Sequence, residues 1–148
     1  MSTEIKLLGV ADAALIEKLA ADVFDYPIDA GGLARFLQDE RHHLAVAIAD
    51  GVVIGFVSAV HYDHPDKARP ELWINQAGVS PDHMRRGVGR ALMHAMLAHG
   101  RALGCTQAWV LTERDNHAAL ALYASSGGKT PSDQVMIEFD LDAGGGGD

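Results

Sequence analysis

The sequence predicts one mixed α/β domain, with helices packed against a mixed β-sheet. Segments with strand periodicity alternate with segments with helical periodicity, and short turns rich in glycine or proline separate them. The length of 148 residues suits a single domain, and the hydrophobic content of 48% supports a full core. We therefore expect the order β-α-α-β-β-β-α-β-α-β over residues 1–142.

The first half of the chain contains a helix signal and a hairpin signal. Asp12 can cap a helix whose apolar positions continue to Phe24. The pair Asp50-Gly51 is typical of a tight turn between two strands. The expected elements are a strand over residues 4–8, the helix after Asp12, a helical segment over 33–37, and strands over 44–49 and 52–61.

The second half of the chain alternates strands and helices. Gly104 ends a long helical pattern, and the glycine run near the C-terminus cannot bury side chains, so we expect residues 143–148 to be disordered. The expected elements are a strand over 71–79, a helix over 87–103, a strand over 105–112, a helix over 116–126 and a last strand over 135–141.

Composition excludes several classes of partner. The net charge of −8 argues against nucleic acid, and no segment is apolar for long enough to span a membrane. The lone Cys105 cannot form an internal disulfide and, with no export signal, fits a cytoplasmic location. The histidines lack metal-ligand spacing, so we expect no metal. We also expect a homodimer.

One stretch combines a strand end, a turn and a glycine-rich helix start. From Trp73 to Leu92 it reads W-I-N-Q-A-G-V-S-P-D-H-M-R-R-G-V-G-R-A-L. A helix start carries unpaired backbone N–H groups and a positive dipole end, and glycines let an anion approach the backbone closely. Arginines add permanent charge. The predicted diphosphate site consists of Arg85, Arg86, Gly87, Val88, Gly89 and Arg90.

Glycine spacing distinguishes this site from other phosphate sites. A dinucleotide site needs G-x-G-x-x-G, but Leu92 occupies the third glycine position, and no P-loop motif is present. The run instead resembles the [QR]-x-x-G-x-[GA] loop of the GNAT superfamily of acyl-CoA-dependent N-acyltransferases, with Met84 where Gln or Arg is usual. The resemblance implies acetyl-CoA as the cofactor.

A second motif lies further along the chain. The run N-H-A-A-L-A-L-Y-A-S-S-G resembles the GNAT pattern N-x-x-A-x-x-[LFY]-Y-x-x-x-G. Asp115 or Asn116 can cap this helix, and Gly127 suits its left-handed end. Ala119 and Tyr123 share one helix face. By the resemblance, the pantetheine arm lies against Ala119, with the Tyr123 hydroxyl near the thioester sulfur.

The resemblance also implies a split in the sheet. Members of the superfamily separate the strand that ends at Val79 from the strand that begins at Cys105, and acyl-pantetheine inserts between them. Ala77 and Val79 would offer backbone groups to the pantetheine and the thioester oxygen. Gly78 marks the expected bulge.

Two segments resemble the type I aminoglycoside 3-N-acetyltransferases. Residues 70–74 are similar to that group's Ser-Glu-Ile-Tyr-Ile strand, and residues 135–141 to its Val-Met-x-Phe-Asp-Ile end. The likeness implies a small cationic acceptor, an aminoglycoside acetylated at the 3-N position. The chain departs from that group at Asn75-Gln76, where an acidic residue would help to bind and deprotonate the ammonium.

Amine acetylation requires a base, an oxyanion donor and an acid. An amine with a lysine-like pKa of about 10.4 must lose a proton before attack. Glu71 is our first choice for the base, with Glu113 and Asp115 in reserve; Val79 N–H can hold the oxyanion and the Tyr123 hydroxyl can protonate the thiolate. The candidate catalytic residues are Tyr123, Glu71 and Asn116, and the candidate substrate carboxylates are Asp63, Asp66, Glu71 and Asp115.

The cofactor motifs do not specify the acceptor. Acceptor loops, here residues 24–32 and 61–70, vary independently of such motifs. Other small amines, protein N-termini and lysines therefore stay open as acceptors. A non-catalytic acyl-CoA sensor is a further alternative, although the chain keeps both Asn116 and Tyr123.

Overall fold

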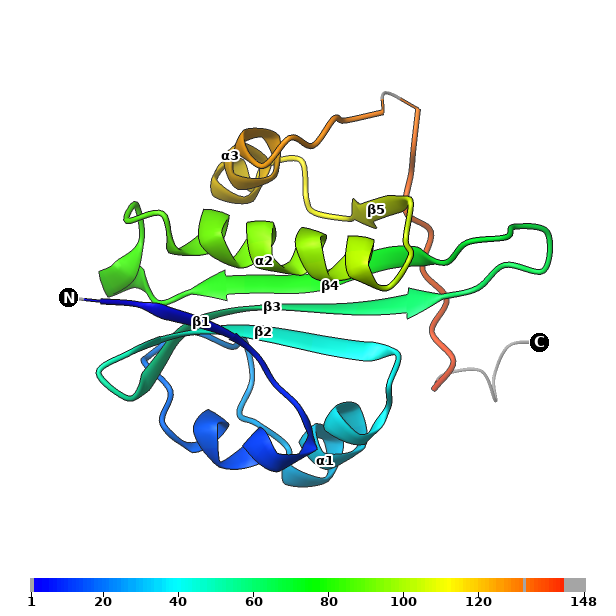
Figure 1. Ribbon diagram of the computed structural model, residues 1–148. Helices are drawn as coiled ribbons and strands as arrows, with labels where there is room; N and C mark the ends of the chain where they lie inside the picture. The colour runs from blue at the N-terminus through cyan, green and yellow to red at the C-terminus, as the bar shows by residue number, and fades with distance from the viewer. Residues whose placement is uncertain (1, 132, 143–148) are drawn as a thin grey trace.

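A computed structural model describes residues 2–131 and 133–142. Its centre is a five-stranded sheet in the order β1-β2-β3-β4-β5, in which neighbours are antiparallel except for the parallel pair β4–β5 (Figure 1). The strands are β1 (Glu4–Leu7), β2 (His42–Ala49), β3 (Val52–Tyr62), β4 (Glu71–Val79) and β5 (Gln107–Val110). The expected mixed α/β domain is confirmed.

Helices cover both faces of the sheet (Figure 1). The helix α2 (Val88–Ala102) lies along one face, and α3 (His117–Ser125) lies beyond it. The 3-10 helix η1 (Val10–Glu17) and α1 (Ala30–Gln38) lie against the other face. A short 3-10 helix, η2 (Pro81–His83), connects β4 to the turn before α2.

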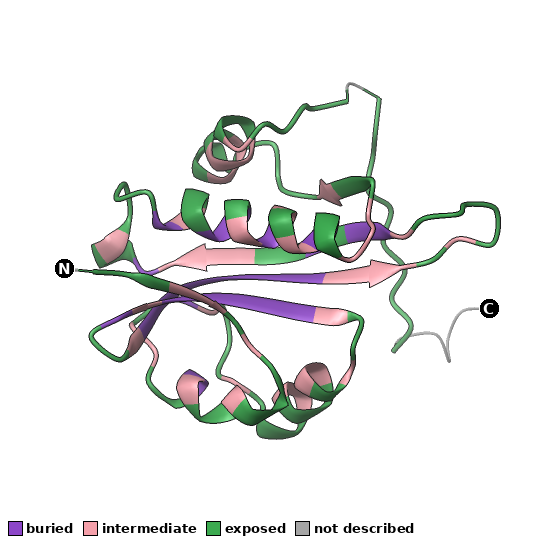
Figure 2. Ribbon diagram, viewed as in Figure 1, coloured by how far each residue is buried: buried purple, intermediate pink, exposed green. Residues whose placement is uncertain are grey.

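The central strands form the core because both their faces are covered. Buried residues gather in β2 and β3 (Figure 2). One apolar cluster joins the sheet to α2, and another joins it to η1 and α1. The Asp50-Gly51 turn between the two strands has φ of 52° and 77°, as the predicted tight hairpin requires.

A bulge interrupts β4 at Asn75. Ser58 of β3 pairs with Gln76, whereas the next residue, Ala59, pairs with Ile74, so Asn75 is the extra residue. The prediction of a bulge at Gly78 was therefore wrong in position. Gly78 stays in register, and a Cβ there would lie 2.4 Å from the carbonyl oxygen of Val23. Close approach of that backbone explains the glycine.

The predicted separation of β4 from β5 is confirmed. The parallel ladder runs from Glu71–Gln107 to Ile74–Val110 and stops there. Residues 75–79 of β4 therefore continue along β3 without a partner from β5 in the described part of the chain.

Three element predictions need correction. The first helix is a 3-10 turn that ends at Glu17, and α1 begins at Ala30, earlier than expected, because the Asp29 carboxylate accepts the Gly32 N–H at 2.7 Å. The expected strand over 135–141 does not form among the described residues, since no neighbouring ladder pairs with it. Its large apolar side chains are exposed: Val135, Met136, Ile137, Phe139 and Leu141. The expected disordered tail, 143–148, lies outside the described residues.

Candidate active site

The turn before α2 presents a row of unpaired backbone donors. Arg85 and Gly87 both have left-handed backbones, with φ of 62° and 79°. The first hydrogen bond of the helix runs from Ala91 N–H to the Gly87 carbonyl, at 3.0 Å. Within residues 2–131 and 133–142, the N–H groups of residues 85–90 have no acceptor. Such a concave set of N–H groups at a helix start binds anions.

The two glycines of this turn have different structural reasons. A Cβ on Gly87 would meet no atom within 4 Å, so its space is open to a ligand. A Cβ on Gly89 would lie 3.3 Å from the Leu122 side chain and 3.6 Å from that of Val79. Gly87 therefore keeps the approach to the backbone clear, whereas Gly89 lets α2 pack closely against α3.

Positive charge surrounds the same turn. Arg85, Arg86 and Arg90 are exposed, and none of them forms a salt bridge within the part of the chain that the structure describes. Their charge is thus available to a ligand. Open space, unpaired donors and unpaired guanidinium groups together fit a diphosphate.

The open edge of β4 leads away from this turn. Ser80 N–H donates to the Ile54 carbonyl of β3 at 2.8 Å. Because the polar groups of successive strand residues point to alternate sides, those of Ala77 and Val79 point away from β3. That side is the one from which β5 has diverged. The expected backbone donors and acceptors for a pantetheine arm therefore lie on the free edge.

Tyr123 lies beside the end of the β4–β5 ladder. A cavity of about 370 Å³ is lined by Tyr123 together with Ile74 and Val110, the last paired residues of the two strands. Burial raises the pKa of the Tyr123 hydroxyl, so it keeps its proton at neutral pH. Asn116 caps this helix, since its side chain accepts the Ala119 N–H at 3.1 Å. The hydroxyl can therefore act as an acid at the split.

Glu71 belongs to a different cluster. Its carboxylate forms ion pairs with Lys67 and, at 3.2 Å, with His64, and it accepts the Tyr62 hydroxyl at 3.3 Å. The hydrogen bond from Lys67 lowers the pKa of Glu71. At about 3.3 Å per strand residue, Glu71 is about 13 Å from Asn75 along β4. This geometry gives Glu71 a structural role and offers no support for it as the base.

The four predicted substrate carboxylates do not converge. Asp63 and Asp66 lie in the loop between β3 and β4, which ends at Glu71. Asp115 lies after β5, and the parallel register directs the end of that strand away from Glu71. The reserve bases, Glu113 and Asp115, follow β5 on the side of the ladder where the two strands separate.

The structure contains a second cavity whose lining residues were not predicted individually from the sequence. It has a volume of about 270 Å³ and lies between the loop before α1, α1 itself and the strands. The sequence indicated the loop over 24–32 as an acceptor loop but singled out no side chain in it. The cavity is lined by Phe24, Asp25, Tyr26, Pro27, Ile28, Asp29, Gly32, Leu33, Phe36, Leu44, Ser58 and Gln76.

The described residues also bear on metal binding and on membrane insertion. The described residues contain no group of three or more His, Cys, Asp or Glu side chains arranged to hold a metal ion. Among the helices that the structure describes, none is long and apolar enough to cross a bilayer.

Known proteins share the sequence pattern of this chain. The profile of the acetyltransferase (GNAT) family matches residues 13–127. The chain is 32% identical over 82 residues to N-acetyltransferase family 8 member 3 of Rattus norvegicus, an alignment that covers 55% of this chain and 36% of the rat protein. The chain thus spans about a third of the length of that relative.

Solved structures share the fold. An aminoglycoside acetyltransferase from an uncultured soil metagenomic sample superposes with a TM-score of 0.80 at 22% identity, covering 95% of this chain and 100% of the other. An aminoglycoside N-acetyltransferase in complex with CoA gives a TM-score of 0.76 at 21% identity, with 95% of each chain covered. At such identities the likeness concerns the fold.

Proposed function

The chain belongs to the acetyltransferase (GNAT) family, and on that premise we propose that it moves an acetyl group from acetyl-CoA to a primary amine of a small cationic molecule. One observation carries the proposal: the unpaired N–H groups of residues 85–90, the free edge of β4 and the Tyr123 hydroxyl follow one another along the split. A diphosphate, an extended arm and a thioester need these groups in that order.

The donor supplies a thioester carbonyl that an amine can attack. The amine nitrogen forms the C–N bond, the C–S bond breaks, and the sulfur leaves with the electron pair. A backbone N–H on the free edge of β4 stabilises the charge that develops on the carbonyl oxygen, and the Tyr123 hydroxyl protonates the departing sulfur. Overall, an ammonium and a thioester become an amide, a thiol and one released proton.

The amine must reach the split unprotonated. For an amine of pKa about 10.4, deprotonation at pH 7 costs roughly 4–5 kcal/mol. Because Glu71 is held by Lys67, we propose that Glu113 or Asp115 takes the proton through water. Both residues follow β5 on the side of the split.

Several finer assignments stay predictions. An aminoglycoside acetylated at the 3-N position is the acceptor that the sequence resemblance implies, and aminoglycoside acetyltransferases share the fold. Protein N-termini, lysines and other small amines are the alternative acceptors. The homodimer is tested by sedimentation equilibrium, and the cytoplasmic location by fractionation.

Thiol release separates an enzyme from an acyl-CoA sensor. We would incubate the protein with acetyl-CoA and a panel of primary amines that includes gentamicin, spermidine, 2-phenylethylamine and a peptide with a free N-terminus. An enzyme releases CoA thiol in an amine-dependent way and forms the matching amide, detected by mass spectrometry. Binding of acetyl-CoA without release in the presence of any amine would instead identify a sensor.

A further inference from the structure

The second cavity meets β4 at the bulge. It is lined by Gln76, whereas the cavity beside Tyr123 is lined by Ile74, and only the extra residue Asn75 separates these two positions. One cavity lies on the α1 side of the sheet and the other on the α2 side. Two molecules that enter from opposite faces would therefore meet where β5 leaves the ladder.

The wall of the second cavity is mostly apolar. The rings of Phe24 and Phe36 are fixed, because Phe24 stacks on Phe56 at 3.9 Å between centroids and Phe36 stacks on His42 at 4.9 Å. At the rim, the Tyr26 side chain is 81% exposed. A preformed apolar cavity with an aromatic rim favours a ligand that has a ring or a branched alkyl body.

Negative charge in this cavity is limited. It contains two carboxylates, Asp25 and Asp29, and the Asp29 carboxylate accepts the Gly32 N–H at the start of α1. Asp25 forms no salt bridge among the described residues. One free carboxylate matches one ammonium, whereas a polyamine sugar would leave several ammonium groups against apolar walls, at a large desolvation cost.

The cavity is also small. Its volume of about 270 Å³ lies just below the range of roughly 300–1,000 Å³ that is typical of drug-sized ligands. A volume of this size holds one ring and a short aminoalkyl chain, whereas the further rings of a polyamine sugar would lie outside the cavity.

We infer that the acceptor is a monoamine with an apolar body, of the arylalkylamine class. Its ring lies between α1 and the loop over 24–29, Asp25 attracts its ammonium, and its amino group reaches the split beside Gln76. The inference rests on the proposed function, because it names the acceptor of that same site.

Acceptor preference tests the inference directly. In the thiol-release assay, kcat/KM for 2-phenylethylamine should exceed those for ethylamine, spermidine and gentamicin by about tenfold or more. Of these amines, only 2-phenylethylamine has an aromatic ring that packs against the apolar wall of the cavity. Higher kcat/KM for gentamicin or spermidine would overturn the inference while leaving acetyl transfer established.

A cavity-filling variant tests whether the acceptor binds in the second cavity. Ile28→Trp puts a larger side chain into the cavity, and Val10→Trp makes a similar change at a 67% exposed position of η1 outside it. We expect Ile28→Trp to weaken binding of 2-phenylethylamine, measured by saturation-transfer NMR, by about tenfold or more. Acetyl-CoA affinity should stay unchanged, and Val10→Trp should have no effect on either ligand.

The binding measurement distinguishes a failure of the acetyl-transfer proposal from a failure of the acceptor inference. If no amine releases thiol but 2-phenylethylamine binds and Ile28→Trp abolishes that binding, the transfer proposal fails and the assignment of the cavity stands. If 2-phenylethylamine does not bind, or binds Ile28→Trp equally well, the inference is wrong whatever the outcome for transfer.

Discussion

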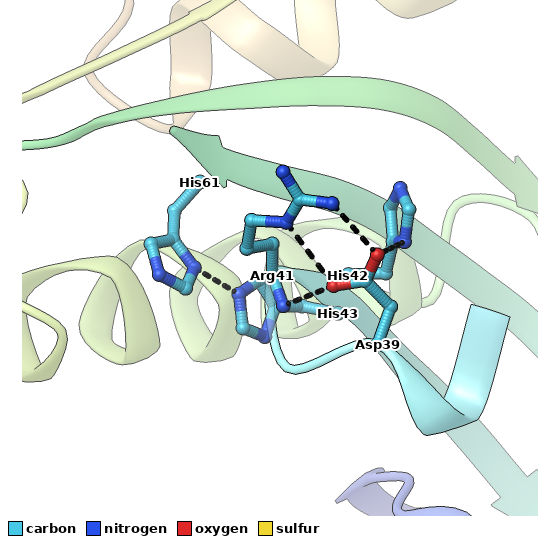
Figure 3. Close-up of polar contacts among 5 residues, drawn as sticks. All are labelled: Asp39, Arg41, His42, His43 and His61. Carbon is cyan, nitrogen blue, oxygen red and sulfur yellow. Dashed lines mark hydrogen bonds and ion pairs between the residues drawn. The ribbon is translucent and has the colours of Figure 1, made fainter. Parts of the chain in front are cut away.

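Acid should destabilise this protein through three hydrogen-bonded histidines, of which the central one, His43, is buried. His43 of β2 is 7% exposed and forms hydrogen bonds with His61 of β3 at 2.7 Å, drawn in Figure 3, and with His99 of α2 at 3.0 Å. With one proton on each ring, both contacts are satisfied. Burial, followed by the charges of His99, His61 and His42, lowers the pKa of His43 from 6.5 to about 4, against a small opposing effect of Asp39.

The direction of the pH effect follows from this shift. Between pH 6.5 and about 4 the unfolded chain binds a proton at His43 that the folded chain does not bind. The contribution of neutral His43 to stability is therefore complete above pH 6.5 and is lost as the pH falls toward 4. The two pKa values correspond to a loss of about 3 kcal/mol in the free energy of unfolding.

Urea denaturation between pH 7.5 and pH 4 measures this loss. His43→Gln removes the titrating group, so its free energy of unfolding should fall less steeply with acid than that of the parent, by about 3 kcal/mol over the range. His94→Gln, at an exposed position of α2, should keep the slope of the parent. The reasoning would be refuted if the His43→Gln and parent curves ran parallel, whatever their difference at pH 7.5.

Three further substitutions test other parts of the account. Tyr123→Phe should leave acetyl-CoA affinity within a few-fold but lower the rate roughly 10²-fold, because it removes the acid; a rate within about twofold of the parent would make Tyr123 a packing residue. Gly78→Ala should lower the free energy of unfolding by about 1–3 kcal/mol in urea, since its Cβ would meet the Val23 carbonyl, and unchanged stability would contradict that contact. Glu71→Gln should lower the melting temperature and leave turnover within about twofold, and a large loss of turnover would restore Glu71 as the base.

Local chemistry was sufficient to predict the elements that depend on neighbouring residues. The Asp50-Gly51 hairpin, the left-handed Gly127, the end of α2 before Gly104 and the cap at Asn116, one of the two predicted capping residues, follow from turn and cap preferences that act within a few residues. The end of the parallel ladder beyond Ile74 also agreed with the family resemblance.

Features that depend on distant contacts were harder to predict. The reason for Gly78 is the carbonyl of Val23, far away in sequence. Lys67 is only four residues from Glu71, but the ion pair between them depends on the fold of the loop before β4, which no helix or strand periodicity specifies. Strand periodicity over 135–141 could not predict whether a neighbouring strand would pair with it. The acceptor cavity joins a loop, a helix and three strands, so no single motif encodes it.

The binding of acetyl-CoA at the turn before α2 is the central claim. Gly87→Asp tests it, because aspartate tolerates a left-handed backbone but places a carboxylate where the diphosphate should approach. Gly51→Asp is the matched control: its φ of 77° is close to the 79° of Gly87, and a Cβ there also meets nothing within 4 Å. Gly87→Asn adds a side chain of nearly the same size without the charge, so it separates steric hindrance from charge repulsion.

Calorimetric titration of acetyl-CoA into these variants is the most direct measurement. Repulsion between unit charges about 4 Å apart is about 4 kcal/mol at an effective dielectric of 20, so Gly87→Asp should weaken binding by about 100-fold or more. Gly87→Asn should weaken it less, and Gly51→Asp should bind like the parent. Equal affinity of Gly87→Asp and the parent, or no binding of acetyl-CoA by the parent, would contradict the claim.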